Sequence, residues 1–361
     1  MSRKVRVGVI GAGAWAVTTH LPAIVADPDV ELVVVNRRNG DLARSIASRF
    51  GALHATDDWR AAIDLGLDAV VVASPPNVHR EQVLAAIASG AHVLCEKPFA
   101  ITAEDAWAMT DAARAADRRL LIAFGWNYMP LMTAARDLML ERGIGRIEYL
   151  NISINVAVRE LLLDGTPYNS AVGGVAPQAE TFVDPAISGG GTAPVTMSHV
   201  FGLGLFLSGL DALDIHCRTV DAHPGVDLHD VMTVGFEGDA IGAFAGTASH
   251  ESVPRVEWHV SIHGTGGQLL LDSNHDEVVF GPPRGEMIRA DLPPGAGVYD
   301  PRGPIRELLA VAKGGAPTDA SPAEMGARTV ELVEAALRSA RTGLVEPVPA
   351  HRPPWARNSG R

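Results

Sequence analysis

The apolar residues of this chain follow two patterns, one in each half of the sequence. Up to about residue 125, short and continuous apolar runs alternate with stretches of helical periodicity. We predict strands at 4–10, 30–36, 69–73, 92–95 and 120–124, and helices at 14–26, 40–50, 78–89 and 102–117. Continuous apolar strands that alternate with helices are typical of a parallel sheet covered on both faces. Residues 1–125 are therefore expected to form an α/β domain with a doubly wound parallel sheet.

Beyond about residue 145 the predicted strands are longer, and apolar and polar residues alternate along them. They are 146–159, 214–221, 229–237, 240–249, 255–263 and 267–272. Gly238-Asp239 and Gly264-Thr-Gly266 stand between successive strands, as in antiparallel hairpins. We expect an α+β domain with an open, mainly antiparallel sheet over 126–345. Its predicted helices are 199–209, about 304–313 and 321–341; 281–304 is expected to be a loop and 346–361 a flexible tail.

Composition argues against several classes of protein. The net charge of −12 disfavours nucleic acid as a partner. No apolar run approaches the roughly 18 residues of a membrane span, and no signal-peptide pattern is present. We therefore expect a cytoplasmic protein with no membrane partner. Cys95 and Cys217 are the only cysteines, and the histidines show no metal-ligand spacing, so no metal is expected.

A glycine-rich segment follows the first predicted strand. Gly11-Ala-Gly13-Ala-Trp-Ala16 fits the pattern Gly-x-Gly-x-x-Gly/Ala, between a predicted strand and a predicted helix. Glycine allows the backbone to turn tightly and approach a pyrophosphate at the helix N-terminus. This predicts a Rossmann domain in which the cofactor is held by Gly11, Gly13, Ala14 and Trp15. The alternative is a glycine-rich turn without a ligand.

The end of the second predicted strand indicates which dinucleotide is bound. Enzymes that use NAD place Asp or Glu there to bind the ribose 2′-hydroxyl, whereas this chain has Asn36, Arg37 and Arg38. A guanidinium can pair with a 2′-phosphate that a carboxylate would repel. NADP(H) is therefore favoured, with NAD(H) possible. The alternative is that the arginines only form a solvated turn.

Glu96-Lys97-Pro98 follows the predicted strand 92–95. With this motif and the glycine loop, the chain resembles the glucose–fructose oxidoreductase / inositol dehydrogenase (Gfo/Idh/MocA) family over residues 4–345. Further matching stretches are Ala73-Ser-Pro-Pro-Asn-Val-His79, Gly90-Ala-His-Val-Leu-Cys-Glu-Lys-Pro-Phe99, Gly143-Ile-Gly145, and Gly189-Gly-Gly191 followed by His199. The resemblance implies a homodimer or homotetramer with contacts on the open sheet, and a substrate bound between the two domains.

The resemblance also assigns roles to residues. Those implied to line the cofactor are Ser74, Pro75, Asn77, His79, Glu96 and Lys97. Lys97 is further implied to contact the substrate and to hydrogen-bond the reacting oxygen, with Glu96 orienting or neutralising it. Hydride transfer leaves negative charge on a carbonyl oxygen, or requires a proton to leave a hydroxyl, and a cation serves both directions. Lys97 is thus the first catalytic candidate; the alternative is a surface lysine.

His199 is the second catalytic candidate. Members of the family carry an Asp four residues before this His, on the same helical face, but here Val195 takes that place. Three explanations stay open: His199 works with Lys97 alone, Thr196 or Tyr168 supplies the missing contact, or dehydrogenase activity is lost. Without the resemblance, a lone His beside an apolar helix is more often structural.

Three further residues are candidates near the active site. Trp126 and Asn127 follow the last strand of the first domain; Trp126 is expected either to close over the nicotinamide or to fill the domain junction. Asn127 and Tyr168 are candidates to bind substrate, Tyr168 within the long segment 160–188, which alternatively forms an oligomer contact.

These patterns together predict an NADP(H)-dependent oxidoreductase. It would interconvert a secondary alcohol and a ketone or aldehyde on a sugar, inositol or similar polyol, by hydride transfer at nicotinamide C4. Two alternatives stay open: an NAD-dependent glycoside hydrolase of the same family, and a catalytically silent NADP-binding protein.

Overall fold

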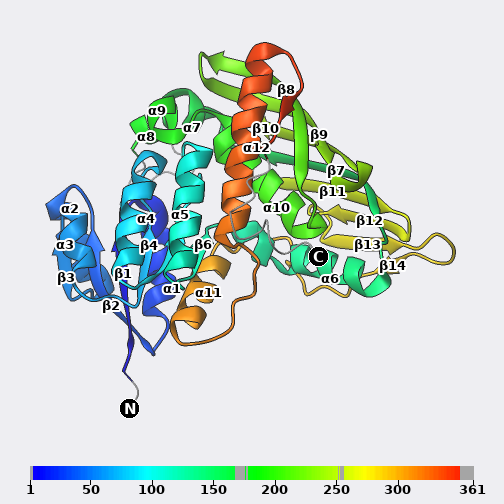
Figure 1. Ribbon diagram of the computed structural model, residues 1–361. Helices are drawn as coiled ribbons and strands as arrows, with labels where there is room; N and C mark the ends of the chain where they lie inside the picture. The colour runs from blue at the N-terminus through cyan, green and yellow to red at the C-terminus, as the bar shows by residue number, and fades with distance from the viewer. Residues whose placement is uncertain (1–2, 167–174, 176–177, 251, 253–255, 350–361) are drawn as a thin grey trace.

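Two sheets lie side by side in the computed structural model, which describes residues 3–166, 175, 178–250, 252 and 256–349 (Figure 1). The first sheet has six parallel strands in the order β3-β2-β1-β4-β5-β6. They are β1 (Val5–Ile10), β2 (Val30–Asn36), β3 (His54–Thr56), β4 (Ala69–Val72), β5 (His92–Cys95) and β6 (Leu120–Ile122). The predicted parallel sheet is confirmed, with β3 as a strand that the apolar pattern did not reveal.

Helices cover both faces of this sheet. They are α1 (Leu21–Val25), α2 (Gly40–Phe50), α3 (Trp59–Ile63), α4 (His79–Ala88) and α5 (Ala103–Ala115), with a 3-10 turn, η2 (Pro76–Val78), before α4. The strand order reverses between β1 and β4, and in doubly wound sheets ligands bind at the carboxyl ends of strands at such a point. The loops after β1 and β4 are therefore where the cofactor site is built.

The helix predicted at 14–26 contains an irregularity. Residues of η1 (Ala16–His20) form a π-helical turn that leads directly into α1. Pro22, in the first turn of α1, has no backbone N–H to donate. A π turn is often found at a functional position, and this one ends at His20, whose side chain reaches the candidate site described below.

The second sheet has nine strands in the order β14-β13-β12-β11-β7-β10-β9-β8-β15. They are β7 (Ile147–Val156), β8 (Ala212–His223), β9 (Val226–Phe236), β10 (Ile241–Ala248), β11 (Glu257–Gly264), β12 (Gly267–Asp272), β13 (Glu277–Gly281), β14 (Ile288–Arg289) and β15 (Glu346–Pro347). All neighbours are antiparallel except β7 and β10. The mainly antiparallel sheet is confirmed, although β14 lies in the predicted loop and β15 in the predicted tail; residues 350–361 lie outside the described residues.

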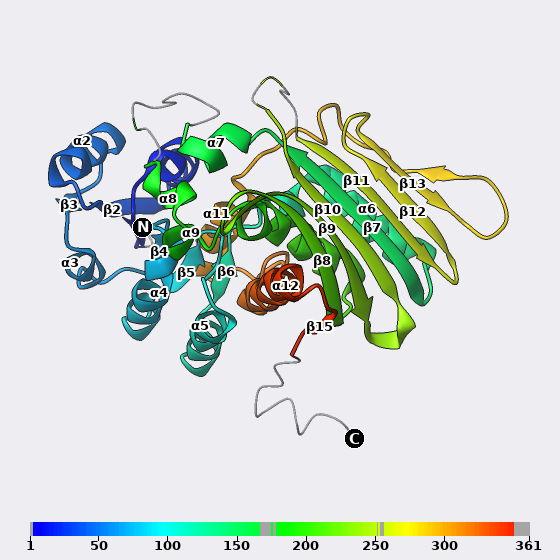
Figure 2. The same ribbon diagram turned by 90° about the horizontal axis from the view of Figure 1, so that it is seen from above.

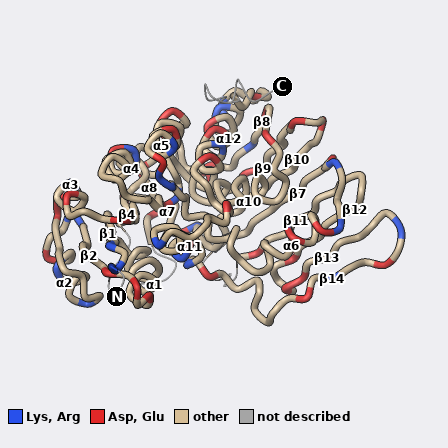
Figure 3. Tube along the Cα trace, turned by 60° about the horizontal axis from the view of Figure 1, so that its bottom comes forward, with Lys and Arg blue, Asp and Glu red and all other residues tan. Residues whose placement is uncertain are grey.

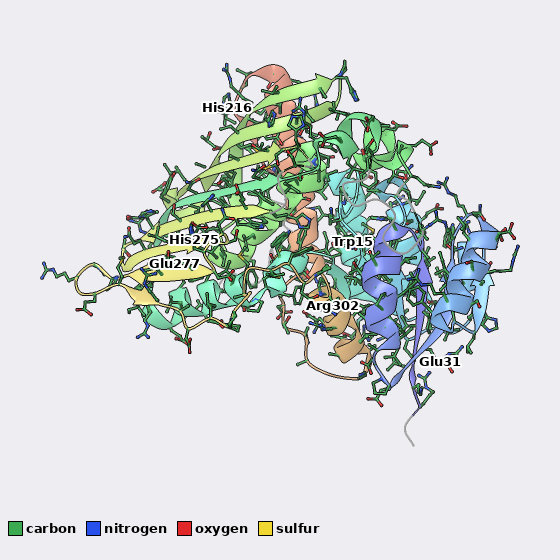
Figure 4. The ribbon with its side chains drawn as sticks, turned by 180° about the vertical axis from the view of Figure 1, so that it is seen from behind. Trp15, Glu31, His216, His275, Glu277 and Arg302 are labelled. Carbon is green, nitrogen blue, oxygen red and sulfur yellow. The ribbon has the colours of Figure 1, made fainter. Side chains whose placement is uncertain are left out.

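One face of the second sheet packs on helices, and the other face is open. The buried sides of its strands form one core with α6 (Pro130–Arg142), α10 (Ser198–Ser208) and the second half of α12 (Ala323–Thr342). Apolar residues such as Val231 and Ile241 are exposed on the open face. Figure 4 views the molecule from that side, with His216, His275 and Glu277 far from Trp15 of the first domain.

The end of the chain returns to the first domain. Helix α11 (Gly303–Ala312) places Ile305, Leu308 and Leu309 in the core around β1 and α1. The first half of α12 packs on α5 and β6, and α12 stands between the two sheets in Figure 2. Although both helices lie beyond residue 125, α11 packs on the first sheet and α12 packs on both sheets.

Candidate active site

The glycine loop after β1 lies against the loop after β4. Gly11 has φ of 75°, a conformation that suits glycine, and a Cβ atom there would lie 2.4 Å from the backbone nitrogen of Ser74. Gly13 has only the carbonyl of Gly11 and the guanidinium of Arg37 within 4 Å of such a position. The loop is thus compact on the protein side, as a backbone cradle for a pyrophosphate requires.

The side chains after β2 turn toward this loop. Asn36 accepts a hydrogen bond from the Gly11 backbone at 3.4 Å and donates to the carbonyl of Thr56. Arg37 donates from Nη1 to the carbonyl of Ala12 at 2.7 Å. Burial, followed by the charge of Arg38, lowers the pKa of Arg37. Arg37 is half-buried, and no carboxylate of the described residues forms an ion pair with it, so an anion bound here would be favourable.

Two of the residues predicted to line the cofactor from β4 hold the loop in shape. The hydroxyl of Ser74 donates to Gln82 at 2.5 Å. His79 is fully buried, with Nε2 at 2.7 Å from the carbonyl of Ser74 and Nδ1 at 3.1 Å from the carbonyl of Phe99. His79 therefore links the loops after β4 and β5 through both ring nitrogens, and contact of its side chain with the cofactor stays a prediction.

Glu96 and Lys97 stand at the end of β5, where the following Lys97–Pro98 peptide bond is cis. Glu96 is buried; its Oε1 lies 2.7 Å from Nε2 of His20, and its Oε2 accepts the backbone N–H of Lys97 at 3.1 Å. Burial raises the pKa of Glu96, but the hydrogen bond and charge of His20 and the charge of Lys97 together bring it below its usual value. Glu96 is therefore ionised at neutral pH.

Lys97 and His199 approach each other across the domains. Burial lowers the pKa of Lys97, and the charge of Glu96 opposes that shift. Burial and then the charge of Lys97 hold the pKa of His199 well below its usual value, so the imidazole is neutral at physiological pH. Phe124 packs edge-on against the His199 ring, at 5.7 Å between centroids, and Nδ1 of His199 is buried without a partner.

The place of the missing Asp is apolar. Val195 lies in η5 (Ala193–Met197), a second π-helical turn, and packs in a cluster with Leu161 of α7 (Arg159–Asp164). Thr196 is buried one position further along. No carboxylate therefore reaches His199 from position 195; the nearby hydroxyls on this stretch of helix are those of Thr196 and Ser198.

Trp126 and Asn127 lie in η3 (Gly125–Tyr128), facing the second domain. Trp126 stacks on Tyr299 at 4.1 Å between centroids and packs edge-on against Trp258 of β11. Asn127 donates from Nδ2 to the carbonyl of Ala320 and is 1% exposed. Trp126 therefore packs between protein side chains in the domain junction, and Asn127 is bonded to the backbone. Contact of Trp126 with the cofactor and of Asn127 with substrate stay predictions. Asn127 depends on the loop before α12, and Trp126 depends on β11 and the segment before α11; local sequence reveals neither contact.

Two contacts near the site were not predicted. His20 bonds Glu96, and Arg38 donates to Gln178 at 2.9 Å, from the segment that precedes α8 (Glu180–Val183). The position of His20 shortly after the glycine loop was the only sequence feature that pointed to its contact with Glu96, and a single histidine is too common to predict such a contact. Tyr168 lies outside the described residues.

Acidic and basic residues are mixed over both domains (Figure 3). No helix of the described chain is long and apolar enough to cross a membrane.

The glycine cradle at the reversal of strand order, with a lysine beside it, defines a nucleotide-dependent oxidoreductase of the Rossmann class. The model of the GFO_IDH_MocA family, described as an oxidoreductase family with an NAD-binding Rossmann fold, matches residues 5–124. Residues 5–124 of this chain therefore carry the Rossmann domain of that family.

Curated relatives match different parts of the chain. A levoglucosan dehydrogenase of Pseudarthrobacter phenanthrenivorans is 37% identical over 32% of this chain and 30% of its own length. A dTDP-3,4-didehydro-2,6-dideoxy-α-D-glucose 3-reductase of Streptomyces violaceoruber is 28% identical over 81% of this chain and 79% of its own. A D-xylose 1-dehydrogenase (NADP(+)) of Haloferax volcanii is 28% identical over 73% of this chain and 74% of its own length.

The whole fold also has solved counterparts. A levoglucosan dehydrogenase in complex with NADH and levoglucosan superposes with a TM-score of 0.78 at 23% identity, over 96% of this chain and all of that one. At this identity the likeness establishes the architecture of both domains.

Proposed function

We propose that this protein is an NADP(H)-dependent oxidoreductase that interconverts a secondary alcohol and a ketone or aldehyde on a sugar, inositol or similar polyol. The observation that carries the proposal is the pairing of Lys97 with neutral His199 beside the glycine cradle. An ammonium next to a neutral imidazole is the pair that removal of a hydroxyl proton requires.

The roles of the residues follow from their charges. The nicotinamide, when bound, supplies or accepts the hydride. Lys97 would bond the substrate oxygen and stabilise negative charge on it. His199, neutral through burial, would accept the proton in the oxidative direction, with Thr196 of the adjoining turn η5 as a candidate hydroxyl for a relay. Gly11, Gly13 and the adjoining backbone would hold the pyrophosphate.

Arg37 supports the choice of NADP. It is a half-buried cation without a carboxylate partner among the described residues, fixed at the glycine loop by Ala12. A 2′-phosphate would supply the missing anion. Two curated relatives with long alignments carry NADP(+) in their names, the xylose dehydrogenase above and a scyllo-inositol 2-dehydrogenase of Bacillus subtilis, 24% identical over 75% of this chain.

Titration of the protein with NADPH and NADH by fluorescence tests this choice. Arg37→Asp is expected to weaken NADPH binding about 10- to 100-fold, because a charge-assisted hydrogen bond is lost and a repulsive charge is added. NADH binding should change little. Arg284→Asp, at an exposed arginine beside the second sheet, is the matched control. Equal affinity for both nucleotides in the unmodified protein would refute the NADP preference.

The names of several relatives specify reaction at the same carbon of a sugar, position 3. They are a glucose-6-phosphate 3-dehydrogenase of Bacillus subtilis, a D-glucoside 3-dehydrogenase of Escherichia coli, and the 3-reductase above. We therefore propose a hydroxyl at position 3 of a hexose as the first reaction to test. Reduction of NADP(+) by methyl glucoside, but not by its 3-deoxy analogue, is the expected result.

A further inference from the structure

A buried contact lies directly behind the proposed catalytic lysine. His20, at the end of the π turn η1, is 1% exposed, and its Nε2 atom lies 2.7 Å from Oε1 of Glu96. The contact joins the helix that follows the glycine loop to the end of β5, so it links both halves of the cofactor site. A bond to a carboxylate requires the proton on Nε2, and Nδ1 of His20 is buried without a partner.

The two oxygens of Glu96 are both occupied by groups other than the Lys97 ammonium. Oε1 faces His20, and Oε2 accepts the backbone N–H of Lys97 at 3.1 Å. In the described part of the chain, no carboxylate lies within 4.0 Å of the Lys97 ammonium. The acid that precedes the lysine in sequence therefore forms no ion pair with its ammonium.

The titratable groups that influence Lys97 come from several elements. Glu96 shares its loop, and His199 of α10 faces it from the second domain. His20 of η1 bonds Glu96, and His79 of α4 lies within electrostatic range of Glu96. Burial lowers the pKa of Lys97 and the charge of Glu96 opposes this, so the distance of Glu96 determines how readily the ammonium releases its proton.

We propose that His20 is a positioning residue, which tethers the Glu96 carboxylate and prevents it from pairing with the ammonium of Lys97. The ammonium then stays available to bond a substrate oxygen. This inference rests on the proposed role of Lys97 in the reaction. A merely structural His20 would fill space without affecting the titration of the lysine.

The lysine content of the chain allows a direct test. Its only lysines are Lys4, Lys97 and Lys313. Acetic anhydride reacts with unprotonated amines, so the extent of labelling from about pH 6 to 11, measured by mass spectrometry of each peptide, gives the apparent pKa of each lysine. The measurement needs neither substrate nor cofactor. Lys4, which is exposed, serves as the internal reference.

His20→Leu is expected to raise the apparent pKa of Lys97 by about one pH unit, because the released carboxylate can approach the ammonium. His20→Gln keeps an N–H donor near the position of Nε2 and should restore the original titration. His54→Leu, at an exposed histidine of β3, is the matched control and should have no effect.

An unchanged titration of Lys97 in a folded His20→Leu protein would overturn the proposal. If that variant does not fold, His20→Asn tests the same point, since its shorter amide also releases Glu96. Steady-state kinetics are measured in parallel, and His20→Leu is expected to lower kcat more than it raises KM. If the unmodified protein oxidises no sugar, the proposed function fails, whereas the labelling still decides whether His20 tethers Glu96.

Discussion

Lys97 is the residue on which the proposed chemistry depends. Of the 30 lysine and arginine residues of the chain, only three are lysines. An ammonium can lose its proton when burial lowers its pKa, as at Lys97, whereas a guanidinium stays charged. The identity of this residue, and not only its charge, should therefore matter.

Lys97→Arg tests that distinction. The substitution keeps the positive charge but replaces a compact ammonium with a larger, planar guanidinium that cannot bond the substrate oxygen from the same position, so kcat is expected to fall about 10²- to 10³-fold. The affinity for NADPH, measured by fluorescence, should change little. Lys313→Arg, at a lysine paired with Asp27 on the surface, is the control. Retention of full turnover by Lys97→Arg would show that the reaction needs only a positive charge at this position and not the ammonium itself.

At the scale of elements, strand β9 and the segment that leads into α10 are joined by a buried acidic pair. Oδ2 of Asp227 accepts the backbone N–H of Ala193 at 2.6 Å, at the start of η5. Asp230 is 1% exposed, and neither of its carboxyl oxygens has a hydrogen-bond partner among the described residues. Burial and then the charge of Asp227 raise the pKa of Asp230 to about 9. The contact that fixes the start of this helix thus has a protonated carboxyl beside it.

This pair predicts a pH dependence of stability. The unfolded chain ionises Asp230 near pH 4, whereas the folded protein keeps its proton up to about pH 9. The folded state therefore binds more protons in this range, and the stability contributed by Asp230 is lost as the pH rises through it.

Asp230→Asn is expected to remove this pH dependence of the free energy of unfolding. The variant is expected to raise the free energy of unfolding by roughly 2–4 kcal/mol near pH 7, and by little near pH 4. Urea unfolding at both pH values measures the difference. Equal effects at the two pH values would show that Asp230 is ionised in the folded protein.

The whole molecule is held together by segments that cross between the sheets. Helices α11 and α12 return from the second sheet to pack on the first, and Trp126 of η3 packs on Trp258 and Tyr299. Lys97 and His199, which come from different sheets, are placed within electrostatic range of each other by this packing. The relative position of the domains is therefore part of the candidate active site.

Trp126→Ala tests whether this residue belongs to the junction or to the cofactor site. Loss of a buried indole is expected to lower the free energy of unfolding by about 3–5 kcal/mol. The dissociation constant of NADPH should stay within a factor of about two, as expected for a residue without cofactor contact. Trp126→Phe, which keeps an aromatic ring, should lose less stability. A large loss of NADPH affinity with an unchanged free energy of unfolding would show that Trp126 contacts the cofactor.

Much of this protein was determined by its sequence alone. Continuous apolar runs such as Ala69–Val72 require burial on both faces, and the alternation along β7 requires burial on one, so the two kinds of sheet could be predicted. The glycine loop and the residues after β2 are local motifs whose chemistry depends on neighbours in sequence. They indicated a dinucleotide site before any contact was known.

Only the tertiary structure decided how distant residues combine. The bond between His20 and Glu96 joins residues 76 positions apart, and the packing of Trp126 against Trp258 and Tyr299 depends on a distant strand and loop. The pKa values of Lys97, His199 and Asp230 follow from burial, which no local pattern specifies. Local motifs fix which chemical groups are present, whereas the packing of separate elements fixes their distances and their solvation, and these determine what the groups can do.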